Sequence, residues 1–412
     1  MALPLVSRAR QPFDTARLSD VPGAITAGLK QVRLAAKIKP GARVAITAGS
    51  RGINNLIGMT RTVADLVKAM GGHPFIVPSM GSHGGATDEG QKGLLAELGI
   101  SEVSMGCPVV SSMQVEEVGR TSKGVPVYLD RNALGADGII VINRVKPHTA
   151  FRGEVESGLC KMLCVGLGKH KGAQQMHAAG LGETIIEASR IILARAPVLA
   201  GVAVLENSLD ETMEIHVVAP EQFEETDRTL LQRAWKTLPR IPFDRLDVAV
   251  VDEMGKNISG TGMDPNVIGI GARVGGKMEM GAPFVAAIVI LGLTAETHGN
   301  ANGVGLADIT TRRLVDSIDY KSTYTNVLTT RLWSAGRLPV IMDTDQEAVE
   351  TAVGAAPPDR VRLVRVKNTL HVHELEISEA LVAEAQAAGL TVLGPAAPMA
   401  FDATGRIRPW EA

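Results

Sequence analysis

The sequence predicts an α/β protein with two domains, each built on a largely parallel sheet. Short β-branched runs alternate with segments of helical spacing. The chain has 412 residues, which exceeds the size at which one hydrophobic core keeps growing. A stretch with two prolines, residues 238–245, separates two such alternating halves. We therefore expect an N-terminal domain at residues 1–240, a C-terminal domain at 241–412 and an active site in the cleft between them.

The first half contains two strand-turn-helix units in succession. The strand expected at residues 43–48 ends in Gly-Ser-Arg-Gly, and apolar residues at helical spacing follow across 54–70. The strand expected at 73–78 precedes a turn and a helix that begins at Thr87 and stops at Gly99. Further strands are expected at 125–129 and 138–143. The second is nearly all apolar, as in a parallel sheet covered on both faces.

The second half repeats this alternation less clearly. Strands are expected at 246–251, 284–293, 339–342 and 391–393, and helices at 309–318 and 382–388. A long, polar, glycine-rich loop, residues 252–266, carries Lys256 and Asn257, which are candidates to hold a substrate carboxylate. A solvated loop is the alternative interpretation. His371 and His373 alternate about Val372, which predicts that both lie on one face of a strand.

Composition excludes several classes of protein. The net charge of -2 gives no general attraction to nucleic acid or to a membrane surface. The longest apolar run, residues 282–295, is too short to span a bilayer, and the N-terminus lacks a targeting pattern. Cys107, Cys160 and Cys164 form an odd set, which indicates a reducing compartment and a cytoplasmic protein. Buried packing or a ligand role remains open for Cys160 and Cys164.

Polar side chains follow three of the predicted strands. Arg51, His83 and His148 each lie in the turn after a strand of the first half. In parallel α/β sheets, ligands bind beyond the carboxyl ends of the strands, so we expect these side chains to converge on one site. Taken singly, each of them is equally compatible with an ordinary surface or turn residue.

Residues 143–177 contain several side chains that are suited to acid-base or metal chemistry. His148, His170, His177 and Lys161 lie within this segment. Imidazole titrates near neutral pH and binds metals, and a lysine in an apolar setting can become a neutral nucleophile. Lys161 has such a setting, between Leu159 and Met162. His170 stands between two lysines, which favours anion contact or exposure, and we leave it out of the metal-binding set.

The motifs resemble those of a known family. The turn Gly81-Ser-His-Gly-Gly-Ala-Thr, the turn with Arg51, and the order His148, Lys161, His177 are similar to the nickel-dependent lactate racemase family. The resemblance covers most of the chain, and it implies two α/β domains that enclose a nickel pincer nucleotide. This cofactor is a pyridinium mononucleotide with two sulfur-bearing arms that hold nickel.

The resemblance also implies a role for each matching residue. Lys161 would tether the cofactor, His177 would bind nickel, and Arg51 would hold the substrate carboxylate. The amides of the turn with Ser82, Gly84 and Gly85 would contact the cofactor. His83 and His148 would be the acid-base pair.

The reaction implied is racemisation or epimerisation of a 2-hydroxy acid. Inversion through a ketone needs one base for each enantiomer and a hydride acceptor that no side chain provides. The expected partners are this substrate and the host proteins that assemble the cofactor, while homo-oligomerisation stays open. Glu154 and Glu156 depart from the family pattern and would repel a phosphate unless Arg152 or Lys146 compensates.

Two other classes of function remain open on the residues alone. A metal-dependent hydrolase or lyase acting on a small carboxylate would use the same histidines to activate water. A binding protein without cofactor would hold a small anion through Arg51 and strand-end amides.

Overall fold

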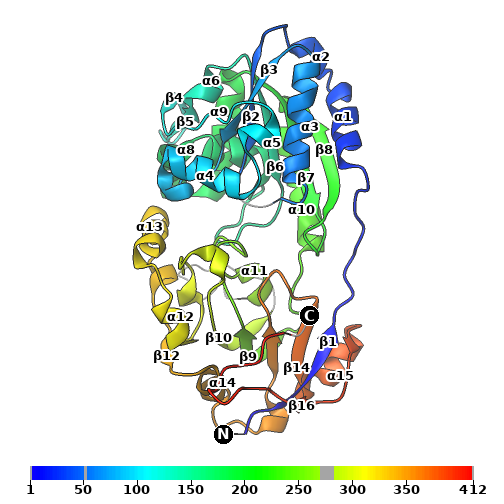
Figure 1. The fold of residues 1–412 in the computed structure, drawn as a ribbon, viewed down its shortest axis with the longest axis vertical. Coiled ribbons are helices and arrows are strands. Elements are labelled where there is room, and N and C mark those ends of the chain that lie inside the picture. The colour runs from blue at the N-terminus through cyan, green and yellow to red at the C-terminus, as the bar shows by residue number, and fades with distance from the viewer. Residues whose placement is uncertain (1, 51–52, 270–282, 411–412) are drawn as a thin grey trace. The chain divides into compact units, whose positions relative to one another are not determined.

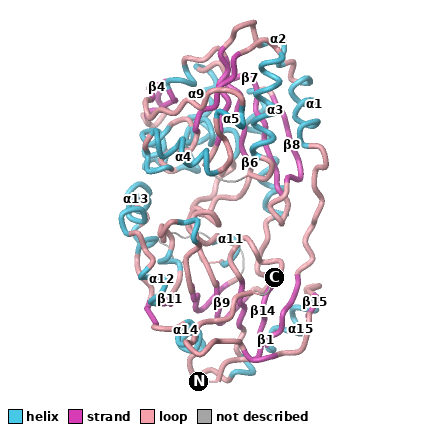
Figure 2. The backbone as a smooth tube through the Cα atoms, in the orientation of Figure 1, coloured by secondary structure: helices cyan, strands magenta, loops and turns pink. Residues whose placement is uncertain are grey.

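The computed structural model describes residues 2–50, 53–269 and 283–410. The chain forms two compact units, whose elements are shown in Figures 1 and 2. We call Thr15–Leu238 the central unit, and we call Met1–Asp14 together with Pro239–Ala412 the split unit. Both are α/β folds with largely parallel sheets, as the sequence predicts.

The central unit is built on a five-stranded sheet of order β3-β2-β6-β7-β8. The strands from β3 to β7 are parallel, and β8 pairs antiparallel with β7. β2 therefore lies between β3 and β6, and the turns after these strands leave the same edge of the sheet. The strands are β2 (Arg43–Ala48), β3 (His73–Pro78), β6 (Gly138–Arg144), β7 (Val198–Glu206) and β8 (Thr212–Val218).

Helices cover this sheet, and a small antiparallel pair lies beside it. The helices are α1 (Val21–Gln31), α2 (Leu34–Lys37), α3 (Leu56–Ala69), α4 (Asp88–Glu97), α5 (Glu102–Met105), α6 (Arg131–Leu134), α7 (Gly158–Lys161), α8 (Lys169–Ala179), α9 (Leu181–Arg195) and α10 (Phe223–Thr237). The predicted strand at 125–129 is β5 (Pro126–Asp130), which pairs with β4 (Val115–Arg120) outside the parallel sheet.

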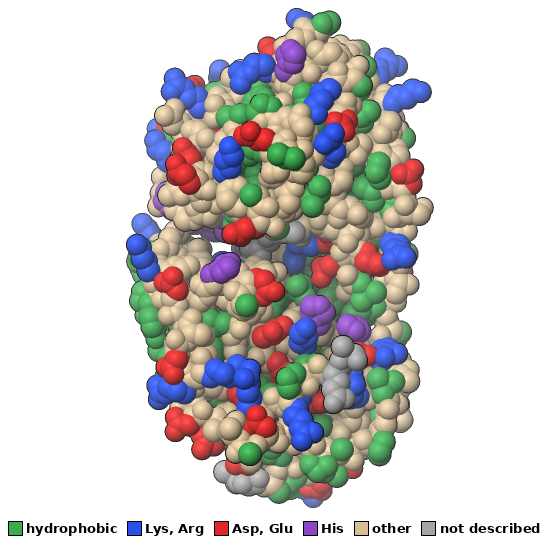
Figure 3. All heavy atoms as spheres, in the orientation of Figure 1, with side chains coloured by type: hydrophobic (Ala, Val, Ile, Leu, Met, Phe, Trp, Pro, Cys, Tyr) green, Lys and Arg blue, Asp and Glu red, His purple; other side chains and the backbone are tan. Residues whose placement is uncertain are grey.

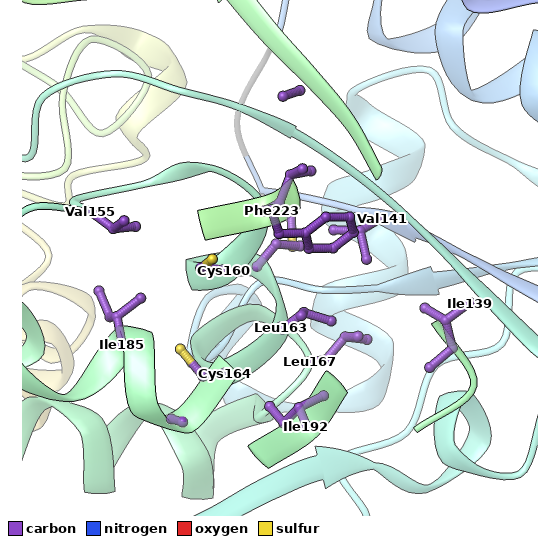
Figure 4. Packing of buried hydrophobic residues seen from close by; sticks show 14 of the residues in the cluster. Ile139, Val141, Val155, Cys160, Leu163, Cys164, Leu167, Ile185, Ile192 and Phe223 are labelled. Atoms are coloured by element: carbon purple, nitrogen blue, oxygen red, sulfur yellow. The ribbon is translucent and has the colours of Figure 1, made fainter. Parts of the chain in front are cut away.

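Successive residues of the central strands face two different layers of helices. In β6, Ile139 and Val141 belong to an apolar cluster with α7, α9 and α10 (Figure 4), whereas Ile140 and Ile142 pack with α1 and α3. Both faces of the sheet are buried, which explains the continuous apolar run of this strand. Cys160 and Cys164 lie in the first cluster, and burial raises the pKa of both thiols. Their role in this structure is packing.

The split unit contains a nine-stranded sheet. The order is β12-β11-β10-β9-β13-β14-β1-β15, parallel from β12 to β13 and antiparallel beyond, with β16 paired to β1. Its elements are β1 (Leu5–Arg10), β9 (Arg245–Val251), α11 (Pro265–Ile268), β10 (Phe284–Ile290), β11 (Ile309–Thr311), α12 (Arg312–Asp316), α13 (Tyr320–Thr330), β12 (Val340–Met342), α14 (Asp345–Val353), β13 (Leu363–Val366), β14 (Glu374–Ser378), α15 (Glu379–Ala387), β15 (Thr391–Val392) and β16 (Ala397–Pro398).

Three expectations differ from the structure in this unit. Residues 1–14 were expected in the N-terminal domain, but β1 pairs with β14, β15 and β16 and so belongs to the split unit. The helix expected at 309–318 is a strand followed by a short helix, because the β-branched run Ile309–Thr311 extends the parallel sheet. His371 and His373 lie in the loop before β14 and not on a strand.

A buried carboxylate fixes the start of the helix that ends in Lys161. Asp227 of α10 accepts hydrogen bonds from the Leu159 and Cys160 amides at 2.9 and 2.8 Å. Gly158 has a φ of +83°, and a Cβ there would approach Asp227 Oδ1 to 2.1 Å. Only glycine therefore allows this close approach. A π-helical turn, Met162–Gly166, then joins α7 to α8.

The surface of the described residues carries charges of both signs. Lysine and arginine side chains are interspersed with acidic ones over the face shown in Figure 3. Within the described part of the chain, no helix is both long and apolar enough to cross a membrane.

We expect Asp227 to make the unfolding free energy depend on pH. Burial raises its folded pKa from 3.8 to about 7, so its stabilising effect is greatest below pH 4 and is lost as pH rises to about 7. Asp227→Asn should lower the unfolding free energy at pH 4.5. Between pH 4 and 7 the unfolding free energy of the variant should fall by up to about 4 kcal/mol less than that of the unsubstituted protein. Urea unfolding of both proteins across this range measures the difference. Parallel pH profiles for the two proteins would contradict the assignment.

Candidate functional site

The turn after β3 holds His83 against the end of β2. Ser50 Oγ lies 2.7 Å from His83 Nδ1, which fixes the orientation of the ring. Ser82 and His83 are half-buried, and Gly84 and Gly85 both have left-handed φ angles, of +63° and +65°. A Cβ on Gly84 would lie 2.6 Å from the Gly90 carbonyl carbon, so the turn requires glycine there.

The loop after β6 carries His148 and is held from inside by Glu156. The carboxylate accepts the His148 amide at 2.7 Å and the Gly153 amide at 3.3 Å, and it pairs with Arg152 at 3.5 Å. Burial raises the pKa of Glu156, and these contacts with the loop oppose that rise. The His148 ring packs on Phe151 with centroids 4.3 Å apart. The loop is therefore ordered by its own polar contacts.

The acidic residues of this loop have protein partners. Glu156 is only 2% exposed and contacts the loop backbone. Glu154 is exposed and pairs with Arg228 of α10 at 2.5 Å. The sequence presents both as charges that would repel a phosphate, with Arg152 or Lys146 as the compensating cation. In the structure Arg152 compensates Glu156, and Arg228 compensates Glu154.

Lys161 and His177 interact electrostatically across the π-helical turn. The pKa of His177 is lowered to about 4, first by burial and second by the positive charge of Lys161. Lys161 Nζ lies 5.3 Å from the centroid of the Phe151 ring and donates to the Glu156 carbonyl at 3.4 Å. His148, Phe151 and Lys161 thus form one connected group of side chains, and the charge of Lys161 acts on His177.

This arrangement has a defined chemical capacity. An imidazole with a pKa of about 4 is neutral at pH 7 and keeps a lone pair for a metal or a proton. Lys161, the last residue of α7, contributes to this lowering of the His177 pKa through its positive charge. Among the described residues, no group of three or more His, Cys, Asp or Glu side chains is placed to hold a metal.

The remaining predicted residues lie elsewhere. Lys256 and Asn257 follow β9 in the split unit, where Lys256 Nζ donates to the Gly260 carbonyl at 2.8 Å. Thr294 donates to Asn257 Oδ1 at 2.7 Å. Their substrate-binding role stays a prediction. Arg51 lies outside the described residues.

Comparison with known proteins finds a matching domain family and a similar fold. Residues 13–192 match the lactate racemase N-terminal domain. This match supports membership of the lactate racemase family. The fold of the chain is similar to the lactate racemase apoprotein from Thermoanaerobacterium thermosaccharolyticum, with a TM-score of 0.51 and 11% identity, over 90% of this chain and 94% of that one. At that identity the likeness shows the fold alone. No curated protein sequence matches this chain.

Several contacts at the candidate site do not follow from the sequence. Ser50 and Phe151 contact the two predicted acid-base residues, and Asp227 caps the helix of Lys161. Ser50 directly precedes Arg51 in a strand-end turn, and this position in the sequence could have indicated that Ser50 lies at the candidate site. The pairing of Asp227 with residues 159 and 160 carries no local signal, because it joins segments far apart in the chain.

We expect removal of the Lys161 charge to raise the pKa of His177. In Lys161→Met apoprotein the value should rise from about 4 but stay below 6.5, because burial is the larger cause. Lys171→Met is the matched control, since Lys171 is an exposed lysine of α8 that packs on Tyr128 instead. Titration of the histidine ring signals by NMR measures the His177 pKa in both variants. An unchanged His177 pKa in Lys161→Met would show that the two side chains are not coupled.

Proposed function

We propose that this protein is a member of the lactate racemase family that racemises or epimerises a 2-hydroxy acid with a nickel pincer nucleotide tethered to Lys161. The observation that carries the proposal is that Lys161 and His148 both pack on the Phe151 ring, with Lys161 Nζ 5.3 Å and the centroid of the His148 ring 4.3 Å from its centroid. A neutral imidazole is a suitable Ni²⁺ ligand, and an adjacent amine suits a covalent tether. The chain's own donors therefore fit the group that the family resemblance implies.

The histidines at the strand ends support the proton-transfer part of this reaction. His83 and His148 follow β3 and β6, the two strands that flank β2. One histidine takes the proton from the hydroxyl oxygen of a substrate enantiomer, and the other serves the opposite enantiomer. The bound cofactor supplies the centre that accepts the hydride from carbon. The second histidine would return a proton to the same oxygen, so that the proton taken by the first is balanced when the configuration is inverted.

Other residues would bind the substrate and the cofactor. Arg51, Lys256 and Asn257 are proposed to hold the substrate carboxylate, and the backbone of Ser82, Gly84 and Gly85 to approach the cofactor. The left-handed glycines support this assignment, because backbone without side chains allows a ligand to come close. The ion pairs of Glu154 and Glu156 with Arg228 and Arg152 reduce the repulsion that these acids would exert on a phosphate.

We expect Lys161 to determine cofactor loading. Protein made together with the cofactor-assembly proteins should carry an intact-mass increase and about one nickel per chain, and Lys161→Ala should lose the covalent mass. Lys171→Ala, on the neighbouring helix, should load normally. Intact-mass and nickel analysis test this, and chiral chromatography of a panel of 2-hydroxy acids identifies the substrate. Hydrolysis of an ester or amide bond in a small carboxylate substrate by an unloaded but metal-bound chain would favour a metal-dependent hydrolase instead.

We expect His83→Gln and His148→Gln to impair opposite half-reactions. Each substitution should slow racemisation by about 10²- to 10⁴-fold with loading retained. In the steady state kcat/KM must fall by the same factor for both enantiomers, because the ratio of the two kcat/KM values equals the equilibrium constant. In a single turnover, however, each variant should fail to form the 2-oxo acid from one enantiomer only. Quenched-flow detection of the 2-oxo acid distinguishes this from the outcome in which both variants fail with the same enantiomer.

A further inference from the structure

Lys169 is a fully buried lysine to which the proposed reaction gives no role. Its Nζ donates to the Pro78 carbonyl at the end of β3 and to Gln91 Oε1 at 3.1 Å, and it pairs with Asp130 at 3.4 Å. These acceptors come from β3, α4 and the end of β5. The ammonium thus donates two hydrogen bonds and has one ion-pair partner in one buried place.

Gln91 transmits this contact to the turn that carries His83. Gln91 is fully buried on α4, and its Nε2 donates to the Gly81 carbonyl at 2.9 Å and to the His83 carbonyl at 3.2 Å. Both amide hydrogens therefore hold the backbone of the turn, while Oε1 is held by Lys169. The Gly81 amide in turn donates to the Gly166 carbonyl of the π-helical turn at 3.2 Å.

The backbone of Lys169 also indicates a specific requirement. Its φ is +54°, in the left-handed region that a side chain with a Cβ occupies only at a cost of about 1–2 kcal/mol. Burial of an ammonium adds a desolvation penalty, which an apolar residue of similar length would avoid. Filling of the core alone does not explain a lysine here. The placement of two of its acceptors, Pro78 and Gln91, on either side of the His83 turn does.

We propose that Lys169 and Gln91 are positioning residues that fasten the His83 turn to the start of helix α8. His177 lies on the same helix and Lys161 precedes it across the π-helical turn. The contact would thereby set the position of the acid-base histidine relative to the tether and the metal ligand. The catalytic meaning of this inference rests on the proposed function, while the structural part does not.

Gln91→Met is the direct test, because it keeps the length of the side chain and removes its three hydrogen bonds. In the apoprotein, amide exchange at residues 81–86 should accelerate, and the His83 Nδ1 shift, which reports the bond to Ser50, should move. In the loaded enzyme, kcat should fall by about 10²-fold with KM changed by less than about threefold. Lys169→Met should act in the same direction. The covalent mass on Lys161 should remain.

Asp130→Asn is the matched control. It alters a partner of the Lys169 ammonium but leaves the bonds of Lys169 to Pro78 and Gln91 in place. It should lower the urea midpoint without changing amide exchange at 81–86 or the His83 shift. If Asp130→Asn slowed the reaction as much as Gln91→Met, the network would serve stability alone and the proposal would be overturned.

The remaining outcomes are also decisive. A folded Gln91→Met protein with an unchanged His83 shift and unchanged exchange would overturn the proposal, as would failure of both Gln91→Met and Lys169→Met to fold. If no protein, the unsubstituted chain included, racemises any 2-hydroxy acid, the proposed function fails. The measurements on the apoprotein still decide whether the turn is positioned by Lys169 and Gln91.

Discussion

The parallel pairing of β2 with both β3 and β6 is the constraint on which the candidate site depends. The register matches Ala48 with Pro78 at the ends of β2 and β3, so the turns that follow begin at the same level. Ser50 therefore meets His83, although 33 residues separate them in the chain. The loop with His148 follows β6 on the other side of β2. Apolar residues on both faces of these strands keep the register fixed.

Three buried ionisable side chains order the irregular backbone around this edge. Glu156 holds the loop of His148, Asp227 holds the first amides of α7, and Lys169 acts on the turn of His83 through Gln91. Each lies at 0–2% exposure. Buried turns leave backbone groups without partners, and a buried charge is tolerated when it is hydrogen-bonded to such groups. Each side chain therefore offsets its own desolvation by satisfying one segment of the site.

The sequence predicts the periodic parts of this structure well. Strands at 43–48, 73–78 and 138–143, and the histidines in the turns after them, follow from local patterns alone. The polar contacts of the site do not, because Asp227 and Lys169 act on residues that are 67 to 91 positions away. The polar run Gly168-Lys-His-Lys also predicts that its lysines are exposed, although Lys169 is buried. For the same reason Glu156 reads as a repelling surface charge and is in fact an internal hydrogen-bond acceptor.

The placement of β1 has a consequence for the order in which the chain folds. The strand is synthesised well before β14, with which it pairs more than 360 residues later in the chain. During translation the central unit can be completed while β1 still lacks its neighbours. Until β14 emerges, the N-terminal strand offers an unpaired edge to any other strand in reach. The alternating Arg8 and Arg10, which later pair with Glu374, place charges on that edge during the interval and oppose its association with other chains.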